Sequence, residues 1–570
     1  MLFKNEKRCA KLIAAVLVMS SLVGCGGEKV SNTSNTEQKK VETAEKQETV
    51  DQKEVIEFNF LSCWNGGGGG FPEDQINNPV AEYIRENFGI QVNYESITTN
   101  EKEKLNTMFA SGVMPDLVNA PMWSVFNGEG QVIMKAAKEE QLLALDDYID
   151  KYPNVKRLYE VGVGKAFEEY HLGHSDFGGK KYVIPQQTPG ENSTDYINWA
   201  YGVYARGDIL KELGVKPEEI DSSEKLYDLL TKIKNGNFKD ISGKPVIPAG
   251  TWHNGWNYGD MLGSWSSYTI SDYRQIGDDV VHYSFLPDEE EKLIYMRRLI
   301  NEGLFDLEAF SNTDTMAKEK MAIGKIAVFG AQSGMGFFST TLLKSNPEMK
   351  FELLGPFKNK DGEIKTQVEQ TGRNGFPAMF MPASLTKQPE KIDAILRFLD
   401  FVNSDEGKLI ANFGIEGIHH DIVDEKPVLK PEVLKLWQED GRAKINAGVF
   451  ALGGFIGADD RMTKYPTSEE DKSQYDKWQD EYKAKLPIKF MEESISADNV
   501  VSLWPGEKEY RDNTSTLNYE DELRKAYFAK TDEDALKILN DYRQKLKDAG
   551  IDELTTFIKE EASKNDKIGF

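Results

Sequence analysis

Cysteine is scarce in this chain, with three among 570 residues. Cys9 and Cys25 lie in the N-terminal segment, and Cys63 is the only other thiol. A single thiol cannot form an intramolecular disulfide, so none is expected in the folded part of the chain. Cys63 ends an apolar stretch, and we expect it to be a small buried hydrophobe. The alternative is a lone catalytic thiol.

The apolar run near the N-terminus is too short to cross a bilayer. Residues 12–24 make a run of 13 small or apolar residues, whereas a membrane helix needs about 20. A short apolar run behind basic residues is typical of a signal peptide, here residues 1–24. The run ends in "LVGC", which resembles a lipobox and implies cleavage before Cys25 and lipidation, for example by palmitate, of its thiol. The alternative is an ordinary secretory signal followed by a chance cysteine.

Positive charge is in deficit. The chain has 69 Lys and Arg residues against 94 Asp and Glu residues, which gives a formal net charge of −25 at pH 7. This acidity argues against nucleic acid as a partner, because phosphate would be repelled. It does not identify a partner, since acidic surfaces are common among exported soluble proteins.

Aromatic side chains are absent from residues 26–54, and apolar ones are few. Such a composition cannot bury enough surface to fold, so we predict that residues 25–54 form a disordered tether. The rest of the chain is too long for one hydrophobic core, and at least two lobes are expected.

The first part of the predicted folded region alternates between strand and helix patterns. Residues 54–64, 90–97 and 114–121 are predicted strands, and residues 77–89 and 100–112 are predicted helices. This order predicts a parallel sheet with helices on its faces. In such sheets ligands bind beyond the carboxyl ends of the strands, which is where Trp64 falls.

Five consecutive glycines, Gly66–Gly70, follow this first strand. A phosphate-binding loop would need Lys and then Ser or Thr after its last glycine, but Phe71 and Pro72 stand there. We therefore expect an irregular loop at the mouth of a binding cleft. The alternative is a loop that is merely flexible. Because no Walker motif is present, no ATPase is predicted in this chain.

Several segments in a fixed order resemble the extracellular solute-binding proteins of ABC importers. They are "MFASGVMPDLV" from Met108, "GGKKYVIPQ" from Gly178, "YARGDILKELGV" from Tyr204, "SDEGKLIANFGIEGIHH" from Ser404 and "DYRQKLKDAGIDELTTFIKEEASK" from Asp541. The chain is most similar to the large oligosaccharide-binding lipoproteins of Firmicutes (family 1 type), and the resemblance covers nearly all of the mature chain.

The resemblance implies an α/β periplasmic-binding-protein-like fold with two lobes, a hinge and an inter-lobe cleft that closes on a sugar. The chain of such proteins passes between the lobes more than once. We place lobe one at residues 55–190 and 328–415, and lobe two at residues 191–327 and 416–570.

Some members of this family bind calcium in a loop rich in Asp and Asn. The matching segment here is residues 232–244, "KIKNGNFKDISGK". Calcium loops alternate oxygen ligands with other residues, but Lys234 and Phe238 interrupt this set. Asn235, Asn237 and Asp240 alone make a poor site, so no metal and no cofactor are expected.

A sugar presents apolar C–H faces and a ring of hydroxyls, so aromatic platforms and polar side chains are the expected contacts. A core helix would not carry the glycines and polar residues of "TWHNGWNYGDMLGSWSSY", and we expect this stretch to contact ligand. The alternative for each tryptophan is buried packing, for the Arg–Asn pair a solvated loop, and for Glu416 a brace at the hinge. The adjacent His419 and His420 are not expected to bind zinc, because their side chains diverge. The candidate ligand contacts are Trp64, Asn65, Trp123, Trp199, Trp252, Asn254, Trp256, Trp265, Arg373, Asn374, Glu416 and His419.

The expected function is substrate capture by a monomeric lipoprotein on the outer face of the cell membrane. Its partners would be an oligosaccharide, the membrane that holds its lipid anchor, and the permease of an ABC importer. One alternative is a surface adhesin or sensor with the same fold. Another is a glycoside hydrolase or lyase, because 94 acidic residues leave room for a carboxylate pair. No catalytic motif is found, and we do not expect an enzyme.

Overall fold

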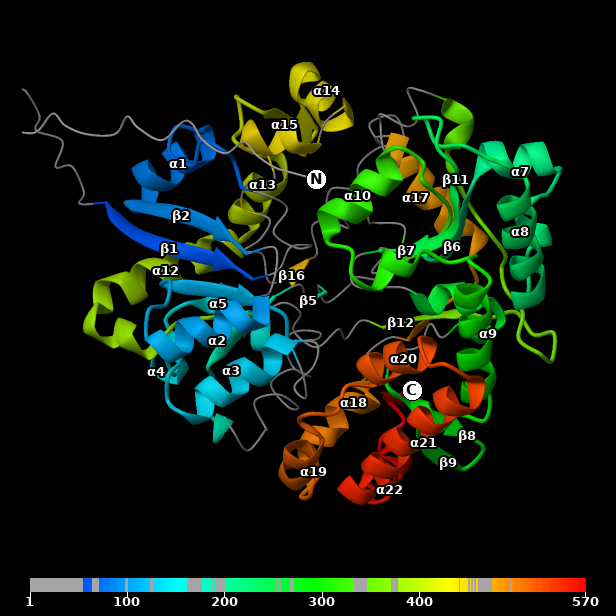
Figure 1. Cartoon of the computed structure of the whole chain (residues 1–570). Helices are drawn as coiled ribbons and strands as arrows, with labels where there is room; N and C mark the ends of the chain where they lie inside the picture. The colour runs from blue at the N-terminus through cyan, green and yellow to red at the C-terminus, as the bar shows by residue number, and fades with distance from the viewer. Residues whose placement is uncertain are drawn as a thin grey trace, which may run out of the picture. The chain divides into compact units, whose positions relative to one another are not determined.

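The computed structural model of the chain describes most residues between Val55 and Phe570 (Figure 1). They are residues 55–63, 71–97, 101–122, 128–160, 177–186, 188–189, 200–252, 255, 258–266, 271–332, 346–370, 378–439, 441–449, 452, 455, 458–459, 474–491 and 495–570.

The first sheet has five strands in the order β2-β1-β3-β13-β4. They are β1 (Ile56–Ser62), β2 (Ile90–Ser96), β3 (Leu117–Ala120), β4 (Val183–Pro185) and β13 (Ala378–Phe380). β1 pairs in parallel with β2 and β3, while β13 runs antiparallel to β3 and β4. The predicted parallel sheet is confirmed for β1, β2 and β3. The carboxyl ends of all strands except β13 share one edge.

Helix α1 (Pro79–Phe88) begins and ends as its sequence predicts. The side chain of Asn78 caps it by accepting hydrogen bonds from the N–H groups of Val80 and Ala81, and Pro79 occupies the first turn. Gly89 closes it in a left-handed conformation with φ of 65°. Helix α2 (Glu101–Ser111) lies on the other side of the sheet (Figure 1).

Aromatic side chains fill the core between the first sheet and helix α12 (Pro389–Val402). The ring of Phe398 lies 5.7 Å from that of Phe58 and 4.9 Å from that of Phe455, while Phe60 lies 4.5 Å from Phe455 (centroid distances). Each fully buried ring contributes about 1.5–3 kcal/mol. The other helices that supply this core are α3 (Gly128–Lys138), α4 (Asp146–Ile149), α5 (Pro153–Glu160) and α13 (Asp405–Phe413).

The second sheet has four strands in the order β11-β6-β10-β7. They are β6 (Tyr201–Arg206), β7 (Ile247–Thr251), β10 (Ile326–Gln332) and β11 (Phe351–Leu353). β10 runs parallel to β7 and antiparallel to β6. The surrounding helices are α7 (Gly207–Leu213), α8 (Ser223–Asn235), α9 (Glu289–Asn301), α10 (Asp314–Ala322) and α17 (Gln474–Lys485).

Two parts of the predicted lobe boundaries differ from the structure. Residues 328–353 were expected in lobe one, but β10 and β11 pair with β6 in the second sheet. Leu452 and Phe455 were expected in lobe two, but they are buried in the core of the first sheet. An apolar strand pattern does not indicate which sheet the strand will join, because strand pairing depends on tertiary packing.

Helices at the C-terminus enlarge the core of the second sheet. The buried side chain of Arg297 on α9 holds them, because its Nη1 donates to the carbonyls of Ala526, Tyr527 and Ala529 and its Nε donates to Asp532 at 2.7 Å. These helices are α18 (Ala497–Val500), α19 (Glu507–Thr514), α20 (Tyr519–Tyr527), α21 (Asp532–Ala549) and α22 (Ile551–Lys564).

Short strand pairs accompany the segments that connect the two sheets. β5 (Thr188–Pro189) pairs with β16 (Ala458–Asp459), and β12 (Gln367–Gln370) pairs with β17 (Ile488–Met491). The remaining elements are the pairs β8 (Tyr273–Ile276) with β9 (Asp279–His282), β14 (His420–Val423) with β15 (Lys426–Leu429) and β18 (Ile495–Ser496) with β19 (Ile568–Gly569), and helices α14 (Pro431–Glu439) and α15 (Gly441–Asn446).

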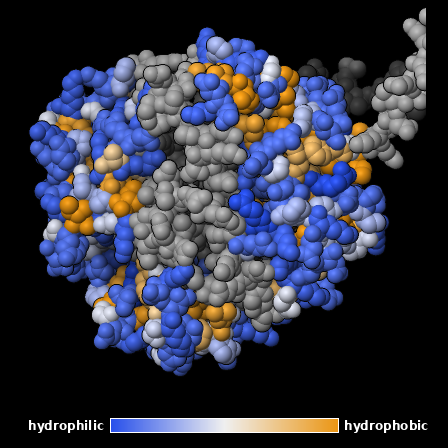
Figure 2. All heavy atoms as spheres, turned by 180° about the vertical axis from the view of Figure 1, so that it is seen from behind, coloured by the Kyte–Doolittle hydropathy of each residue, from blue (hydrophilic) through white to orange (hydrophobic). Residues whose placement is uncertain are grey.

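Hydrophilic side chains dominate the face shown in Figure 2, and hydrophobic ones form small separate groups. Within the described ranges, no helix is long and apolar enough to cross a membrane. The thiol of Cys63 is free and 1 % exposed, and burial raises its pKa to about 12. It is therefore the buried hydrophobe that the sequence predicts.

Candidate functional site

Uncharged polar side chains gather at the carboxyl edge of the first sheet. Ser62 ends β1, Asn119 lies near the end of β3, and Gln186 follows β4, each less than 5 % exposed. The amide nitrogen of Asn119 donates to the side-chain oxygen of Gln186. We call Ser62, Asn119 and Gln186 the amide edge. The chain leaves this edge into residues 64–70, 123–127 and 187, which lie outside the described residues.

The amide edge contains an acceptor without a donor. The buried side-chain oxygen of Asn119 has no hydrogen-bond partner in the part of the chain that the structure describes. Leaving such an atom buried and unpaired costs free energy, and native structures seldom do so. A hydroxyl group of a ligand is the kind of donor that would satisfy it. Sequence reasoning missed Asn119 and Gln186, although Asn119 lies near the end of the strand in "MPDLVNAP" and Gln186 directly follows the strand in "YVIPQ".

The matching edge of the second sheet also carries an amide. The side-chain oxygen of Gln367, which is 2 % exposed, accepts a hydrogen bond from the N–H of Tyr201 at 3.1 Å. Tyr201 begins β6 opposite Gln332, the last residue of β10. The same edge therefore receives the end of β10, the start of β6 and the start of the β12 segment.

Two of the predicted tryptophan contacts lie in the described residues. Trp252 is fully buried, and its ring meets that of Phe329 edge to face at 5.8 Å. It therefore belongs to the core behind the second sheet. Trp265 ends the short 3₁₀ segment Tyr258–Trp265 and is only partly buried.

Most of the other candidate contacts cannot be placed. Trp64, Asn65, Trp123, Trp199, Asn254, Trp256, Arg373 and Asn374 lie outside the described residues, as does Cys25. Their assignment to ligand or lipid stays a prediction.

His419 links the loop after α13 to the end of α15. Its Nδ1 accepts from the N–H of Ile415 at 2.8 Å, and its Nε2 lies 2.6 Å from the carbonyl oxygen of Ala447. Burial lowers its pKa, so the neutral ring with the proton on Nε2 fits both contacts. Glu416 is exposed in the same loop. Neither lies at a strand edge described above, and their roles in binding stay predictions.

No zinc pair is formed by the two adjacent histidines. Nδ1 of His420 lies 3.1 Å from the carbonyl oxygen of Phe413, whereas His419 faces Ala447. Across the described ranges, no group of three His, Cys, Asp or Glu side chains is arranged to hold a metal.

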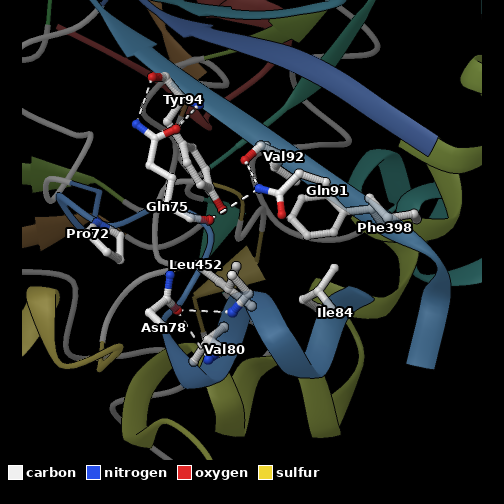
Figure 3. A pocket seen from close by; sticks show the side chains of 12 residues that line it. Pro72, Gln75, Asn78, Val80, Ile84, Gln91, Val92, Tyr94, Phe398 and Leu452 are labelled. Carbon is white, nitrogen blue, oxygen red and sulfur yellow. Dashed lines mark hydrogen bonds between the residues drawn. The ribbon is translucent and has the colours of Figure 1, made fainter. Parts of the chain in front are cut away.

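The segment after the glycine run is anchored on β2 (Figure 3). The side chain of Gln75 donates to the carbonyl of Tyr94 at 3.0 Å and accepts from its N–H at 2.8 Å, as a neighbouring strand would. Phe71 stacks on Tyr94 with centroids 4.1 Å apart. The cavity beside them measures about 10 Å³, which is room for about one water molecule. It is too small for a sugar, and its lining includes Pro72, Gln75 and Asn78 of the segment that lies against β2.

The loop that corresponds to the family's calcium site does not fit a calcium ion. One oxygen of the buried Asp240 accepts from the N–H groups of Ser242 and Lys244 and from the hydroxyl of Ser242. Its other oxygen faces the ammonium of Lys325 at 3.9 Å. Lys325 also donates to the carbonyl of Pro245 at 2.6 Å. A side-chain cation therefore stands where calcium would need oxygen ligands.

Comparison with known proteins adds to this geometry. The bacterial extracellular solute-binding protein family matches residues 72–409. The chain is 22 % identical over 344 residues to the polygalacturonan/rhamnogalacturonan-binding protein YtcQ of Bacillus subtilis, covering 60 % of this chain and 63 % of that protein. It is 25 % identical over 323 residues to the fructooligosaccharide ABC transporter substrate-binding protein FusA of Streptococcus pneumoniae, covering 55 % of each. The matched regions thus span less than two thirds of both curated relatives.

Solved structures show the fold. FusA in complex with kestose superposes with a TM-score of 0.62 at 16 % identity, over 90 % of this chain and 99 % of that one. The alginate-binding protein AlgQ2 without calcium superposes with a TM-score of 0.61 at 21 % identity, over 89 % and 98 %. The predicted two-lobed α/β fold is confirmed by these likenesses.

Proposed function

Because this chain belongs to the bacterial extracellular solute-binding protein family, we propose that it captures an oligosaccharide and delivers it to the permease of an ABC importer. The unpaired oxygen of Asn119 carries the proposal, because it is a buried acceptor at the sheet edge where α/β proteins bind ligands. The relatives named above for polygalacturonan and fructooligosaccharide binding support a carbohydrate as the ligand.

Binding would use paired amides and aromatic faces. Sugar hydroxyls would donate to Asn119 and exchange hydrogen bonds with Gln186, and tryptophans on the neighbouring loops would cover the apolar faces of the rings. The segments around β5–β16 and β12–β17 would serve as the hinge, so that the two lobes close on the sugar. In this proposal no residue acts as a catalyst, and the sugar would pass to the permease chemically unchanged.

The N-terminal segment would attach the protein to the membrane. In this proposal Cys25 carries the lipid anchor, and residues 25–54 tether the folded part to the outer face of the cell membrane. The folded part would act as a monomer and present its closed form to the permease.

Calorimetric titration with a panel of neutral and acidic oligosaccharides tests the proposal. We expect saturable binding of one class, and an Asn119→Ala variant should bind it about tenfold more weakly, the worth of one or two buried hydrogen bonds. Asn93→Ala is the matched control, because Asn93 is a partly exposed residue of β2 in the same sheet. No binding across the panel, or release of reducing ends at catalytic rates, would refute the proposal.

A further inference from the structure

Lys365 is a cation without an anion. Its side chain is half-buried, and its Nζ donates to the carbonyl of Ser266, yet it forms no ion pair among the described residues. Other cations buried in the second lobe do have carboxylates: Arg206 is paired with Asp208 at 2.6 Å, and Lys320 with Asp306 at 2.6 Å. Buried lysines are rarely left unpaired.

The residue before Ser266 carries a donor without an acceptor. Trp265 directly precedes Ser266, and its buried indole N–H has no hydrogen-bond partner within the described ranges. Its ring is held edge to face against Tyr295 at 5.2 Å, and the ammonium of Lys360 lies 5.7 Å from its centroid. A buried tryptophan N–H usually finds an acceptor.

The cations around Lys365 are accompanied by carboxylates. Burial, together with the charges of Lys292 and Arg274, lowers the pKa of Lys365 to about 8, while Asp288 acts in the opposite direction. Asp288 is itself engaged by Lys292 at 3.3 Å. Lys360 is paired with Glu291. Lys292 also pairs with Glu289 at 3.0 Å. Lys365 differs from these neighbours, because within the described residues it has no carboxylate partner and its contact at Ser266 adjoins the unpaired indole N–H of Trp265.

An anion with two oxygens would satisfy the ammonium and the indole together. We propose that Trp265 and Lys365 form a receptor for a carboxylate group, and that the oligosaccharide captured by this protein carries uronate residues. This inference rests on the proposed function for the sugar part of the ligand. Lys365 comes two residues before Gln367, which begins β12 and accepts a hydrogen bond from Tyr201 at the edge of the second sheet.

Titration with trigalacturonic acid and with its methyl ester tests the receptor, because esterification removes the charge of the carboxyl groups and leaves the sugar backbone unchanged. The wild-type protein should bind the acid, and Lys365→Met and Trp265→Phe should each weaken that binding about tenfold or more, the worth of a charge-assisted hydrogen bond. Trp265→Phe keeps an aromatic ring for Tyr295. Lys358→Met is the control, since Lys358 lies on the same segment but is exposed and paired with Asp221 at 2.9 Å. Thermal unfolding of each variant shows whether it is folded.

The pH dependence gives a second readout that a purely structural lysine would not produce. Affinity for the acid should fall as pH rises above about 8, the pKa of Lys365, because the ammonium then loses its proton. The methyl ester should show no such fall.

Each outcome decides a different point. Equal binding of the acid by wild type and Lys365→Met would overturn the receptor and leave the proposed function standing. Binding of neutral oligosaccharides alone would overturn the uronate class. If no oligosaccharide binds but free galacturonate or phosphate does so through Lys365, the receptor takes small anions and the proposed function fails. Failure to bind any of these probes would overturn both.

Discussion

The two candidate sites differ in the kind of hydrogen-bonding group that lacks a partner among the described residues. At the amide edge of the first sheet it is an acceptor, the side-chain oxygen of Asn119, whereas at the second site it is a donor, the indole N–H of Trp265, accompanied by the ammonium of Lys365, which donates to a carbonyl but has no carboxylate partner. A neutral sugar hydroxyl suits the first group, and a carboxylate suits the second. The two proposals together predict that one ligand with both groups would use both sites.

The lobes also differ in how their cores are held. The first core depends on aromatic packing around Phe398 and Phe455, while the second is joined to its C-terminal helices by the buried guanidinium of Arg297. Apolar packing does not respond to pH or to the loss of a charge, but a buried cation and a buried histidine do.

The largest expected effect comes from breaking the contact that is unique to the second lobe. Arg297→Met leaves three carbonyl oxygens without their donor, and we expect the free energy of unfolding to fall by about 3–5 kcal/mol in urea titrations. Arg298→Met, on the next and partly exposed position, should cost less than about 1 kcal/mol. Similar losses in both variants would contradict the role of Arg297.

Acid should weaken the second lobe through His282. Burial lowers the pKa of His282 to about 3, while the unfolded chain titrates near 6.5. The unfolded state therefore binds more protons below pH 6.5, so stability is complete above that pH and is lost as pH falls. The loss should reach about 2 kcal/mol at pH 5.

The variant His282→Asn separates this contribution from other acid effects. Nδ1 of His282 accepts from the N–H of Ser284 at 3.3 Å, and an asparagine oxygen can take that place without titrating. Unfolding measured between pH 7 and pH 5 should lose most of its slope in the variant. An unchanged slope would show that other groups, such as His419 and His420, whose pKa values burial also lowers, dominate.

Removal of Lys325 should have a smaller effect. Lys325→Met leaves one oxygen of Asp240 buried without a cation, and we expect a loss of about 1–2 kcal/mol. The Tm of the wild-type protein should not change with calcium or with a chelator. A calcium-dependent rise in the wild-type Tm would contradict the conclusion that the ammonium of Lys325 takes the place of a calcium ion beside Asp240.

The smallest effect concerns Gln75, which holds the segment after the glycine run against β2 in the first lobe. Gln75→Ala removes two hydrogen bonds to the backbone of Tyr94, a local loss of about 1 kcal/mol. Hydrogen exchange at the amide of Tyr94 should accelerate while global unfolding stays nearly constant. Unaltered exchange there would show that Phe71 stacking alone holds the segment.

Sequence patterns predicted the elements of the first sheet well, because their determinants are local. Asn78, Pro79 and Gly89 cap α1 as expected, and the strand that ends in Ser62 and Cys63 is buried as its apolar run predicts. Trp252 shows the limit of such reasoning. Its polar and glycine-rich neighbours favoured a ligand contact, yet the structure packs it against Phe329.

The sequence did not predict which polar side chains of the candidate sites would have hydrogen-bond partners. Asn119 and Lys365 stand in ordinary strand-end and loop sequences, and whether a polar side chain is paired depends on residues far away in the chain. The pairing of Asn119 with Gln186 joins positions 67 residues apart, and that of Lys365 with Ser266 joins positions 99 apart.

By itself the sequence determined the α/β class and the resemblance to solute-binding proteins, since caps and short motifs act over a few neighbouring residues. The export segment and the tether that the sequence predicts lie outside the described residues. Only the tertiary structure decided that β10 and β11 join the second sheet, that an ammonium faces Asp240, and that the Asn119 oxygen and the Trp265 indole N–H lack partners among the described residues. Hydrogen-bond satisfaction and strand pairing are properties of residues brought together from distant positions, so they exist only once the chain has folded.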